Sequence, residues 1–146
     1  MAQHVEGLEG ASFPFPLETG KVLEFVESLH GNLSAWQGDQ TVIPPTFLTS
    51  AFFWERRVDG ADVKNAIEFD PSRSVHAEQI FEFHGPPPKP DDELSAKSRV
   101  DKIYQKTNRA GQNMTFVDVV TDYYDRDGEH RASSPMRAIE FPKDSS

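Results

Sequence analysis

The most apolar run of this sequence reads Ile43-Pro44-Pro45-Thr46-Phe47-Leu48-Thr49-Ser50-Ala51-Phe52-Phe53-Trp54. Proline is favoured in a first helical turn, where its missing N–H would find no partner anyway, and Thr46 or Thr49 could cap the free amides. No helix breaker follows until Gly60. Because apolar side chains would run nearly all round such a helix, we expect residues 46–57 to form a central helix that is buried on most sides.

The length of 146 residues indicates a single domain that can bury roughly 70% of its unfolded surface. We expect this domain to span residues 1–146, with flexible ends at 1–11 and 142–146. The sequence contains no cysteine, which excludes disulfides and thiolate metal sites. It also shows neither a basic leader followed by an apolar run nor a stretch long enough to span a membrane, so we expect a soluble, cytoplasmic protein.

The formal net charge of -9 argues against a nucleic-acid binder, which needs a basic face to displace counterions from phosphates. The densest basic pair is Arg56-Arg57, directly after the apolar run. It has two interpretations. The pair is either a solvated helix end, where cations suit the helix dipole, or a docking point for the phosphates of a thioester carrier.

The first half of the chain otherwise predicts one short amphipathic helix. Apolar residues recur at spacings of three and four between Lys21 and Leu29, with Thr19 as a cap and Gly31 as a stop. A loop over residues 30–42 leads from it to the apolar run. Residues 58–74 are polar and broken by glycine and proline, which predicts an irregular excursion.

In the second half of the chain, residues alternate between two faces with the period of β-strands. Strands are expected over His76–His84, Glu93–Thr107, Met114–Tyr124 and Glu129–Phe141, with a bulge near Lys102. Helices followed by antiparallel strands make an α+β domain, in which one face of the sheet covers the helix at 46–57.

Two smaller signals refine the strand predictions. The Asp127-Gly128 pair favours a hairpin, because glycine accepts a positive φ without strain. Pro135 has no N–H to donate, which indicates an edge or a bulge in the last strand.

The order of these elements and their residue patterns resemble the MaoC-like dehydratase N-terminal domain, a hotdog-fold hydratase/dehydratase family that includes the FAS1-type dehydratase domain. The resemblance covers residues 12–141. It rests on Pro44-Pro45-Thr46-Phe47, on the His-x-Glu-Gln-x-Phe-x-Phe-His pattern at 76–84, on the proline-and-acid turn at 86–93, and on Asp127-Gly128. It implies an antiparallel sheet wrapped around a central helix, and two such folds joined side by side.

The resemblance also implies a chemistry: hydration of a trans-2-enoyl thioester, or dehydration of the (R)-3-hydroxyacyl thioester, carried on coenzyme A or acyl carrier protein. Active members of the family use an Asp and a His on a Gly-Asp-x-Asn-Pro-x-His segment after the first helix. Here Gly31 and Trp36 occupy those two positions. Neither residue can transfer a proton, so we expect no catalytic pair in this chain.

An acyl site is expected beside the apolar helix, because ligand sites are lined mostly by apolar groups with few polar ones. Trp36 is either a core residue or a wall of that site. His84 is a weak candidate for acid–base work, and His76 could pair with Glu78 two residues away on one strand face. We expect no metal and no cofactor other than the substrate carrier. The expected substrate-binding residues are Trp36, Pro45, Thr46, Phe47, Phe52, His76 and Gln79.

The leading hypothesis is therefore an acyl-thioester-binding subunit of an (R)-specific enoyl hydratase or 3-hydroxyacyl dehydratase that needs a catalytic hotdog partner. Fatty-acid and steroid substrates are both compatible with it. The alternative is a non-enzymatic homodimer that binds an acyl or polycyclic ligand. A third hypothesis is an enzyme whose acid–base pair has moved, with His84 as one member.

Overall fold

The computed structural model describes residues 2–38 and 41–144. The α-helices are α1 (Thr19–Ser28) and α2 (Phe52–Glu55), and the 3-10 helices are η1 (Ala2–Val5), η2 (Leu33–Trp36), η3 (Pro45–Ala51), η4 (Val63–Ala66) and η5 (Pro71–Arg73). The strands are β1 (Phe13–Pro16), β2 (Ser74–Gln79), β3 (Glu82–Phe83), β4 (Glu93–Thr107), β5 (Asn113–Tyr124) and β6 (His130–Glu140).

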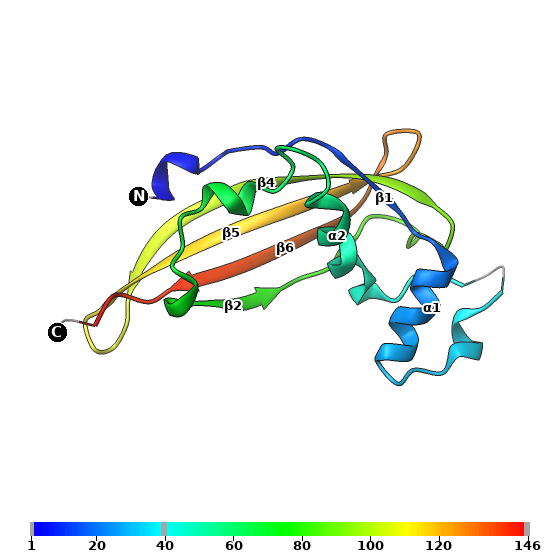
Figure 1. Cartoon of the computed structure of the whole chain (residues 1–146), viewed down its shortest axis with the longest axis horizontal. Coiled ribbons are helices and arrows are strands. Elements are labelled where there is room, and N and C mark those ends of the chain that lie inside the picture. Colours follow the sequence, from blue (N-terminus) through cyan, green and yellow to red (C-terminus); the bar gives the residue numbers. More distant parts are fainter. Residues whose placement is uncertain (1, 39–40, 145–146) are drawn as a thin grey trace.

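The strands form one antiparallel sheet in the order β1-β4-β5-β6-β2, and β3 pairs with β6 beyond the end of β2. Figure 1 shows α2 lying against one face of this sheet, which we call the concave face, while α1 lies beyond one end of it. The segment η3–α2 contributes Phe47, Leu48 and Ala51 to the same buried cluster as β1 and β5. The predicted α+β architecture, a sheet around a central helical segment, is thus confirmed.

The long strands lie close to their predicted positions. The pairing of β4 with β5 shifts register between Val100 and Lys102, which confirms the predicted bulge near Lys102. The turn at Asp127-Gly128 closes the β5–β6 hairpin, where Gly128 adopts φ 80°. Alternating apolar residues set the two faces of these strands, since successive side chains point to opposite sides.

The strand predicted at His76–His84 is two strands, β2 and β3, and Pro135 explains the break. Pro135 lies inside β6, where its carbonyl oxygen accepts a hydrogen bond from Ile80 N at 2.9 Å. The nitrogen and carbonyl of one residue in a strand point to the same side, so the missing N–H of Pro135 faces the gap between β2 and β3. The prediction that Pro135 marks an edge or a bulge is therefore wrong. Pro135 lies inside the sheet, opposite the break between β2 and β3.

The central segment is shorter and less regular than predicted. Residues 45–51 form a 3-10 helix and only Phe52–Glu55 are α-helical, in place of one helix over 46–57. Thr49 and Ser50 donate their hydroxyl hydrogens to the carbonyls three residues earlier, at 2.6 and 2.7 Å. Such side-chain bonds compete with regular helix geometry. No side chain caps the start of the segment, so the predicted threonine cap is wrong.

Burial of the central segment is one-sided. Phe47 is buried, stacks on Phe15 with 6.0 Å between ring centroids, and meets Phe25 of α1 edge-on at 5.4 Å. Phe52 and Phe53 are instead 47% and 45% exposed. The expectation of burial on most sides is therefore wrong for the last turn, where apolar rings face outward.

Helix α1 matches its predicted position, although Glu18 rather than Thr19 is its N-cap residue and makes no side-chain bond. Val22 and Val26 are buried, whereas Leu29 lies past the helix end and is 59% exposed. The helix ends as predicted before Gly31, whose N–H returns to the Val26 carbonyl at 2.9 Å.

The segments predicted as flexible or irregular run over the body of the domain. Gly7 N and Gly10 N donate to carbonyls of β4 at 2.8 Å each, and Val5 is buried. The excursion at 58–74 holds only η4 and η5. Residues 39 and 40 of the predicted loop, and residues 1, 145 and 146 of the predicted ends, lie outside the described residues. None of the described helices is long and apolar enough to cross a membrane.

Candidate functional site

A pocket of about 390 Å³ lies between the end of the central segment and the concave face of the sheet. Helix α2 stops at Glu55, so it covers only part of this face, and the space beyond its last turn stays open. The apolar lining includes Phe13, Leu48, Phe52, Val119 and Met136, and the polar lining includes Glu55, Lys64, His76, Gln79, Thr121 and Ser134. A mostly apolar hollow with a few polar groups is the usual composition of a small-molecule site.

The sheet brings the polar groups into one line. Ser98 of β4 pairs with Thr121 of β5, and Thr121 pairs with Ser134 of β6. Residues opposite one another on neighbouring strands share a face, so these three hydroxyls form a row across the concave side. Gln79 of β2 extends it, because its Nε2 donates to Ser134 Oγ at 2.7 Å. We call Ser98, Thr121, Ser134 and Gln79 the polar row.

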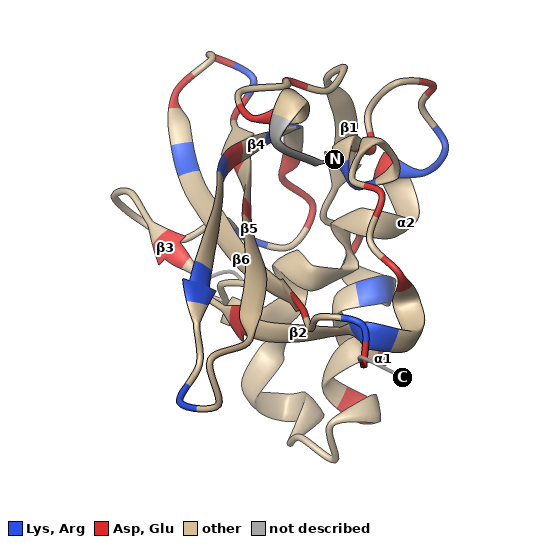
Figure 2. Cartoon of the chain, turned by 90° about the vertical axis from the view of Figure 1, so that its left-hand side faces the viewer, with Lys and Arg blue, Asp and Glu red and all other residues tan. Residues whose placement is uncertain are grey.

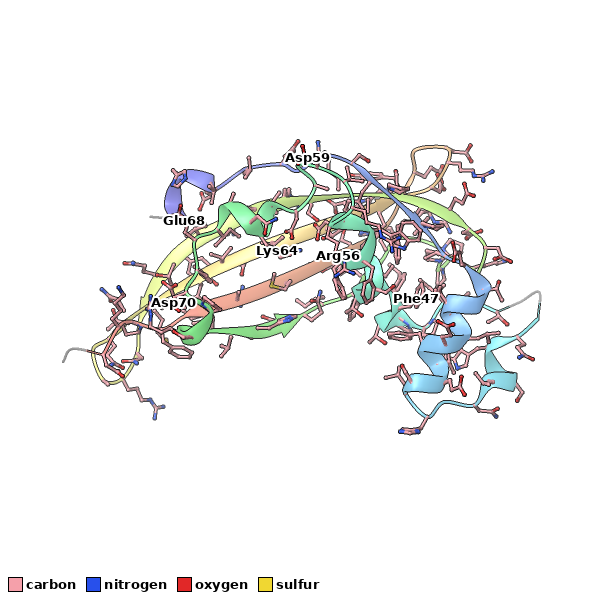
Figure 3. The ribbon with its side chains drawn as sticks, viewed as in Figure 1. Phe47, Arg56, Asp59, Lys64, Glu68 and Asp70 are labelled. Atoms are coloured by element: carbon pink, nitrogen blue, oxygen red, sulfur yellow. The ribbon has the colours of Figure 1, made fainter. Side chains whose placement is uncertain are left out.

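Glu55 reaches the polar row from α2. The residue is only 3% exposed, and its Oε1 accepts a hydrogen bond from Ser98 Oγ at 2.6 Å. Its Oε2 accepts from Lys64 Nζ at 2.5 Å, and Lys64 also approaches Asp62 at 3.3 Å. Lys64 belongs to η4, and Figure 3 shows it over the sheet, on the side of η4 that faces α2. A buried carboxylate needs such partners, because burying an unpaired charge is costly.

Tyr123 forms the apolar end of the pocket. Its hydroxyl donates to the Leu48 carbonyl at 3.2 Å, which ties β5 to the central segment. Burial raises the pKa of Tyr123 well above its usual value, and the negative charges of Glu55 and Asp122 raise it further. The phenol therefore stays protonated and serves as a hydrogen-bond donor.

A bulge in β2 decides which residues of that strand meet the pocket. The pairing of β2 with β6 shifts register between His76 and Glu78, so His76 and Gln79 line the pocket together. Glu78 instead pairs with Arg137 at 3.1 Å on the other face. The prediction that His76 and Glu78 share a strand face is therefore wrong, since the bulge separates them. His76 Nε2 lies 3.0 Å from the backbone carbonyl oxygen of Glu78, within hydrogen-bond distance.

Three of the residues expected to bind substrate, Phe52, His76 and Gln79, meet in the pocket. The others do not line it. Pro45 and Thr46 are exposed, Phe47 belongs to the core, and Trp36 is half-buried in η2. Sequence reasoning missed Glu55, Lys64, Thr121 and Ser134. The signal that could have found the two hydroxyls is the alternation of the strands, which places Thr121 and Ser134 among inward-facing residues.

The position that the resemblance assigns to an aspartate is closed to side chains. A Cβ on Gly31 would lie 2.7 Å from Val26 Cγ1 and 3.1 Å from the Val26 carbonyl oxygen. Both Gly31 and Trp36 lie apart from the residues that line the pocket. A side chain at position 31 would therefore press against Val26, and glycine avoids this contact.

His84 lies on the opposite, convex face of the sheet. Its Nε2 is 3.3 Å from Ser133 Oγ, and its ring stacks on His130 with 4.4 Å between centroids. Ser133 alternates with Ser134, which faces the pocket. The sheet therefore separates His84 from the pocket. Within residues 2–38 and 41–144, no three His, Cys, Asp or Glu side chains are grouped to hold a metal.

The two arginines after α2 stack on its aromatic rings. Arg56 lies 5.1 Å from the centroid of Phe53, and Arg57 lies at the same distance from that of Trp54. Both arginines are exposed, and no carboxylate of the described residues forms an ion pair with either. Cation–π contacts of this kind leave the guanidinium groups accessible to solvent and to anions.

A curved antiparallel sheet around a short helical segment, with a pocket beneath that segment, defines a hotdog domain. The chain belongs to the family described as FAS1-like, dehydratase domain region, whose model matches residues 7–133. It is thus a member of the hotdog hydratase and dehydratase family. Membership in this family supports a hydro-lyase kind of activity. No curated protein matches the chain in sequence.

Solved structures share the fold at low identity. The ChsH1–ChsH2 complex from Mycobacterium tuberculosis is 14% identical with a TM-score of 0.72, covering 99% of this chain and 89% of that chain. The HadBC complex from the same organism, a (3R)-hydroxyacyl-ACP dehydratase, is 19% identical with a TM-score of 0.65, covering 95% and 99%. A MaoC-like dehydratase from Phytophthora capsici is 14% identical with a TM-score of 0.70, covering 99% of this chain and half of that one, 50%.

Proposed function

We propose that this chain is the acyl-thioester-binding subunit of an (R)-specific enoyl hydratase or 3-hydroxyacyl dehydratase, and that its catalytic Asp and His come from a partner. The observation that carries the proposal is the pocket of about 390 Å³ under a shortened central helix. It occurs in a family member that has Gly31 and Trp36 at the positions of the acid–base pair. Room for an acyl group is thus combined with residues other than Asp and His at the two positions that the resemblance assigns to the acid–base pair.

The edge of the sheet next to the pocket supports the need for a partner. Strand β2 is the last strand of the sheet, and Val75 on it is 47% exposed. Ile80, Phe52 and Phe53 add exposed apolar side chains near this edge, with exposures of 39%, 47% and 45%. Apolar surface beside an unpaired strand suits docking of a second sheet. Two structural neighbours are themselves heteromeric complexes.

Activity measurements test the division of labour. The purified chain alone should hydrate crotonyl-CoA at a negligible rate and should gain activity when a hydratase subunit with an intact Asp and His is added. Robust activity of the isolated chain would overturn the non-catalytic role. In that event His76→Gln, at the pocket, and His84→Gln, on the convex face, would show which histidine acts.

Blocking the pocket tests its role in binding. Val119 lines the pocket, whereas its neighbour Val120 points to the convex face. Val119→Phe should weaken binding of an acyl pantetheine thioester at least 10-fold, because the new ring occupies the space for the chain. Val120→Phe is the matched control and should bind as the parent does. Equal affinities of the two variants, both shown to be folded by thermal melting, would remove the pocket from the proposal.

Native mass spectrometry separates this role from the alternative of a non-enzymatic homodimer. A chain that forms a stable complex only with a catalytic hotdog subunit supports the proposal. A stable homodimer that carries a ligand and does not bind such a subunit favours the alternative.

A further inference from the structure

The polar row interrupts an otherwise apolar surface. On one side of it lie Ala96, Tyr123 and Ala132, and on the other lie Val100, Val119 and Met136, each set paired across β4, β5 and β6. The two sets belong to two separate hydrophobic clusters. A sheet face that served packing alone would gain by continuing the apolar pattern through the row, because buried hydroxyls stabilise less than buried methyl groups.

The hydrogen bonds at the Glu55 end of the row leave acceptors unused. Ser98 must donate its hydrogen to Glu55, since a carboxylate only accepts. Thr121 Oγ1, 2.8 Å from Ser98 Oγ, is then the donor of that bond, and its own lone pairs accept no hydrogen bond from a described residue. Glu55 accepts two bonds from the described residues, about half of what a carboxylate can accept. Both Glu55 and Thr121 line the pocket.

The Gln79 end of the row has the same property. Gln79 Nε2 donates to Ser134 Oγ at 2.7 Å and to the Pro135 carbonyl at 3.1 Å, which uses both amide hydrogens. The amide oxygen of Gln79 accepts no hydrogen bond from any described residue. Spare acceptors thus lie at both ends of the row and face one pocket.

Anchoring of α2 accounts for only one member of the row. Ser98 alone bonds to Glu55, whereas Thr121, Ser134 and Gln79 make no side-chain bond to the central segment. These three residues stand on three different strands and line the pocket that α2 leaves open. Their common property is the surface that they offer to an occupant of the pocket.

We propose that Glu55, Thr121 and Gln79 make this pocket selective for an acyl group that carries a hydroxyl within its hydrophobic body, in preference to a plain alkyl chain. A ligand hydroxyl supplies a donor for the spare acceptors of Glu55, Thr121 and Gln79, while its carbon neighbours contact the apolar sets on both sides. This inference rests on the proposed acyl-binding function and names the substrate class of the same site.

Binding of matched thioesters tests the selectivity. The probes are dodecanoyl pantetheine and its three derivatives hydroxylated at carbon 8, 10 or 12, with affinities measured by isothermal titration calorimetry on the full chain. At least one hydroxylated probe should bind about 5- to 10-fold more tightly than dodecanoyl pantetheine, the net gain expected from one hydrogen bond.

Thr121→Val removes the hydroxyl and keeps the shape of the side chain, so it should reduce that preference to less than about 2-fold while binding of the plain chain is retained or improved. Glu55→Gln should reduce the preference as well. Ser133→Ala is the control, because Ser133 is the neighbour of Ser134 on the convex face and should leave the preference unchanged. Thermal melting establishes that each variant is folded. Should Glu55→Gln fail to fold, Thr121→Val and a Gln79→Met variant carry the same comparison.

The outcomes separate the two levels of the argument. If dodecanoyl pantetheine binds and no hydroxylated probe binds more tightly, the selectivity is wrong while the acyl-binding function stands. A preference that survives in Thr121→Val and Glu55→Gln also overturns the assignment to the row. If none of the four thioesters binds, the proposed function and the selectivity fail together.

Discussion

The two faces of strand β5 carry polar residues in opposite ways. On the convex face, Arg137 binds Asp118 with two hydrogen bonds of 2.7 and 3.0 Å, and Arg99 pairs with Asp122. On the concave face, Thr121 stands in the polar row near the buried Glu55. Figure 2 shows residues of both charges distributed along the strands of the sheet.

The two faces differ in how completely their polar groups are paired with one another. The convex arginines keep 35% and 37% of their side chains exposed, and their carboxylate partners are matched to them. Exposed pairs of this kind contribute little to stability. On the concave face Glu55, Ser98 and Ser134 are buried and Thr121 and Gln79 are half-buried, and hydrogen-bond acceptors are left over. The convex face therefore carries charges that are matched to one another, whereas the concave face leaves acceptors beside the pocket.

Among substitutions that test this difference between the two faces, the largest loss of stability is expected at Lys64. Lys64→Met leaves Glu55 buried without its cation, which should lower the free energy of unfolding by about 3 kcal/mol, the low end for such a loss because Lys64 is itself 39% exposed. Lys97→Met is the control, since Lys97 pairs with Glu9 in solvent and its loss should not move the midpoint. Urea unfolding measures both. Equal midpoints for the two variants would contradict the contrast.

A smaller effect is expected at Tyr123. Tyr123→Phe removes the buried hydrogen bond to the Leu48 carbonyl and should cost about 1 kcal/mol. The pKa of Tyr123 is raised from 10.0, so the folded state holds the phenolic proton more tightly than the unfolded state. Its contribution to stability is complete below about pH 10 and is lost as the pH rises further.

Melting curves between pH 8 and pH 11 check the alkaline behaviour. The parent protein should lose more stability than Tyr123→Phe across this range. If the stability of the parent protein and of Tyr123→Phe fell equally with pH, the phenol of Tyr123 would not be buried as described.

The smallest effect is expected on the convex face. Arg137→Lys keeps the charge but loses the paired hydrogen bonds to Asp118, and it should change the free energy of unfolding by less than about 1 kcal/mol. Its affinity for an acyl pantetheine thioester should equal that of the parent protein. Thermal melting and calorimetry measure the two quantities, and a clear loss of ligand affinity would show that the convex face contributes to binding.

The fold was predictable because strand patterns depend on neighbours in sequence. Alternation located β4, β5 and β6, and the bulge near Lys102 followed from its loss of regularity. The central segment was predicted too long. Its apolar residues correctly predicted a helical segment. The hydroxyls of Thr49 and Ser50, however, donate to backbone carbonyls three residues earlier, and the segment forms a 3-10 helix followed by a single α-helical turn.

The candidate site was predictable only in part. Phe52, His76 and Gln79 were expected at a ligand site and line the pocket. Glu55 was missed because a charged residue at a helix end is normally solvated, and only the approach of Ser98 and Lys64 from distant parts of the chain makes its burial possible. The bulge at His76 was likewise invisible, since it depends on pairing with β6.

Pro135 has a consequence for assembly that reaches beyond its own strand. By withholding one N–H, it ends β2 at Gln79 and limits this edge strand to Ser74–Gln79, with a bulge between His76 and Glu78 inside it. Six residues of strand measure roughly 20 Å. A further strand that pairs with β2 can add hydrogen bonds only along that length, and in the register that β2 dictates. A single missing hydrogen atom thus sets the length of the seam on which a partner can be received.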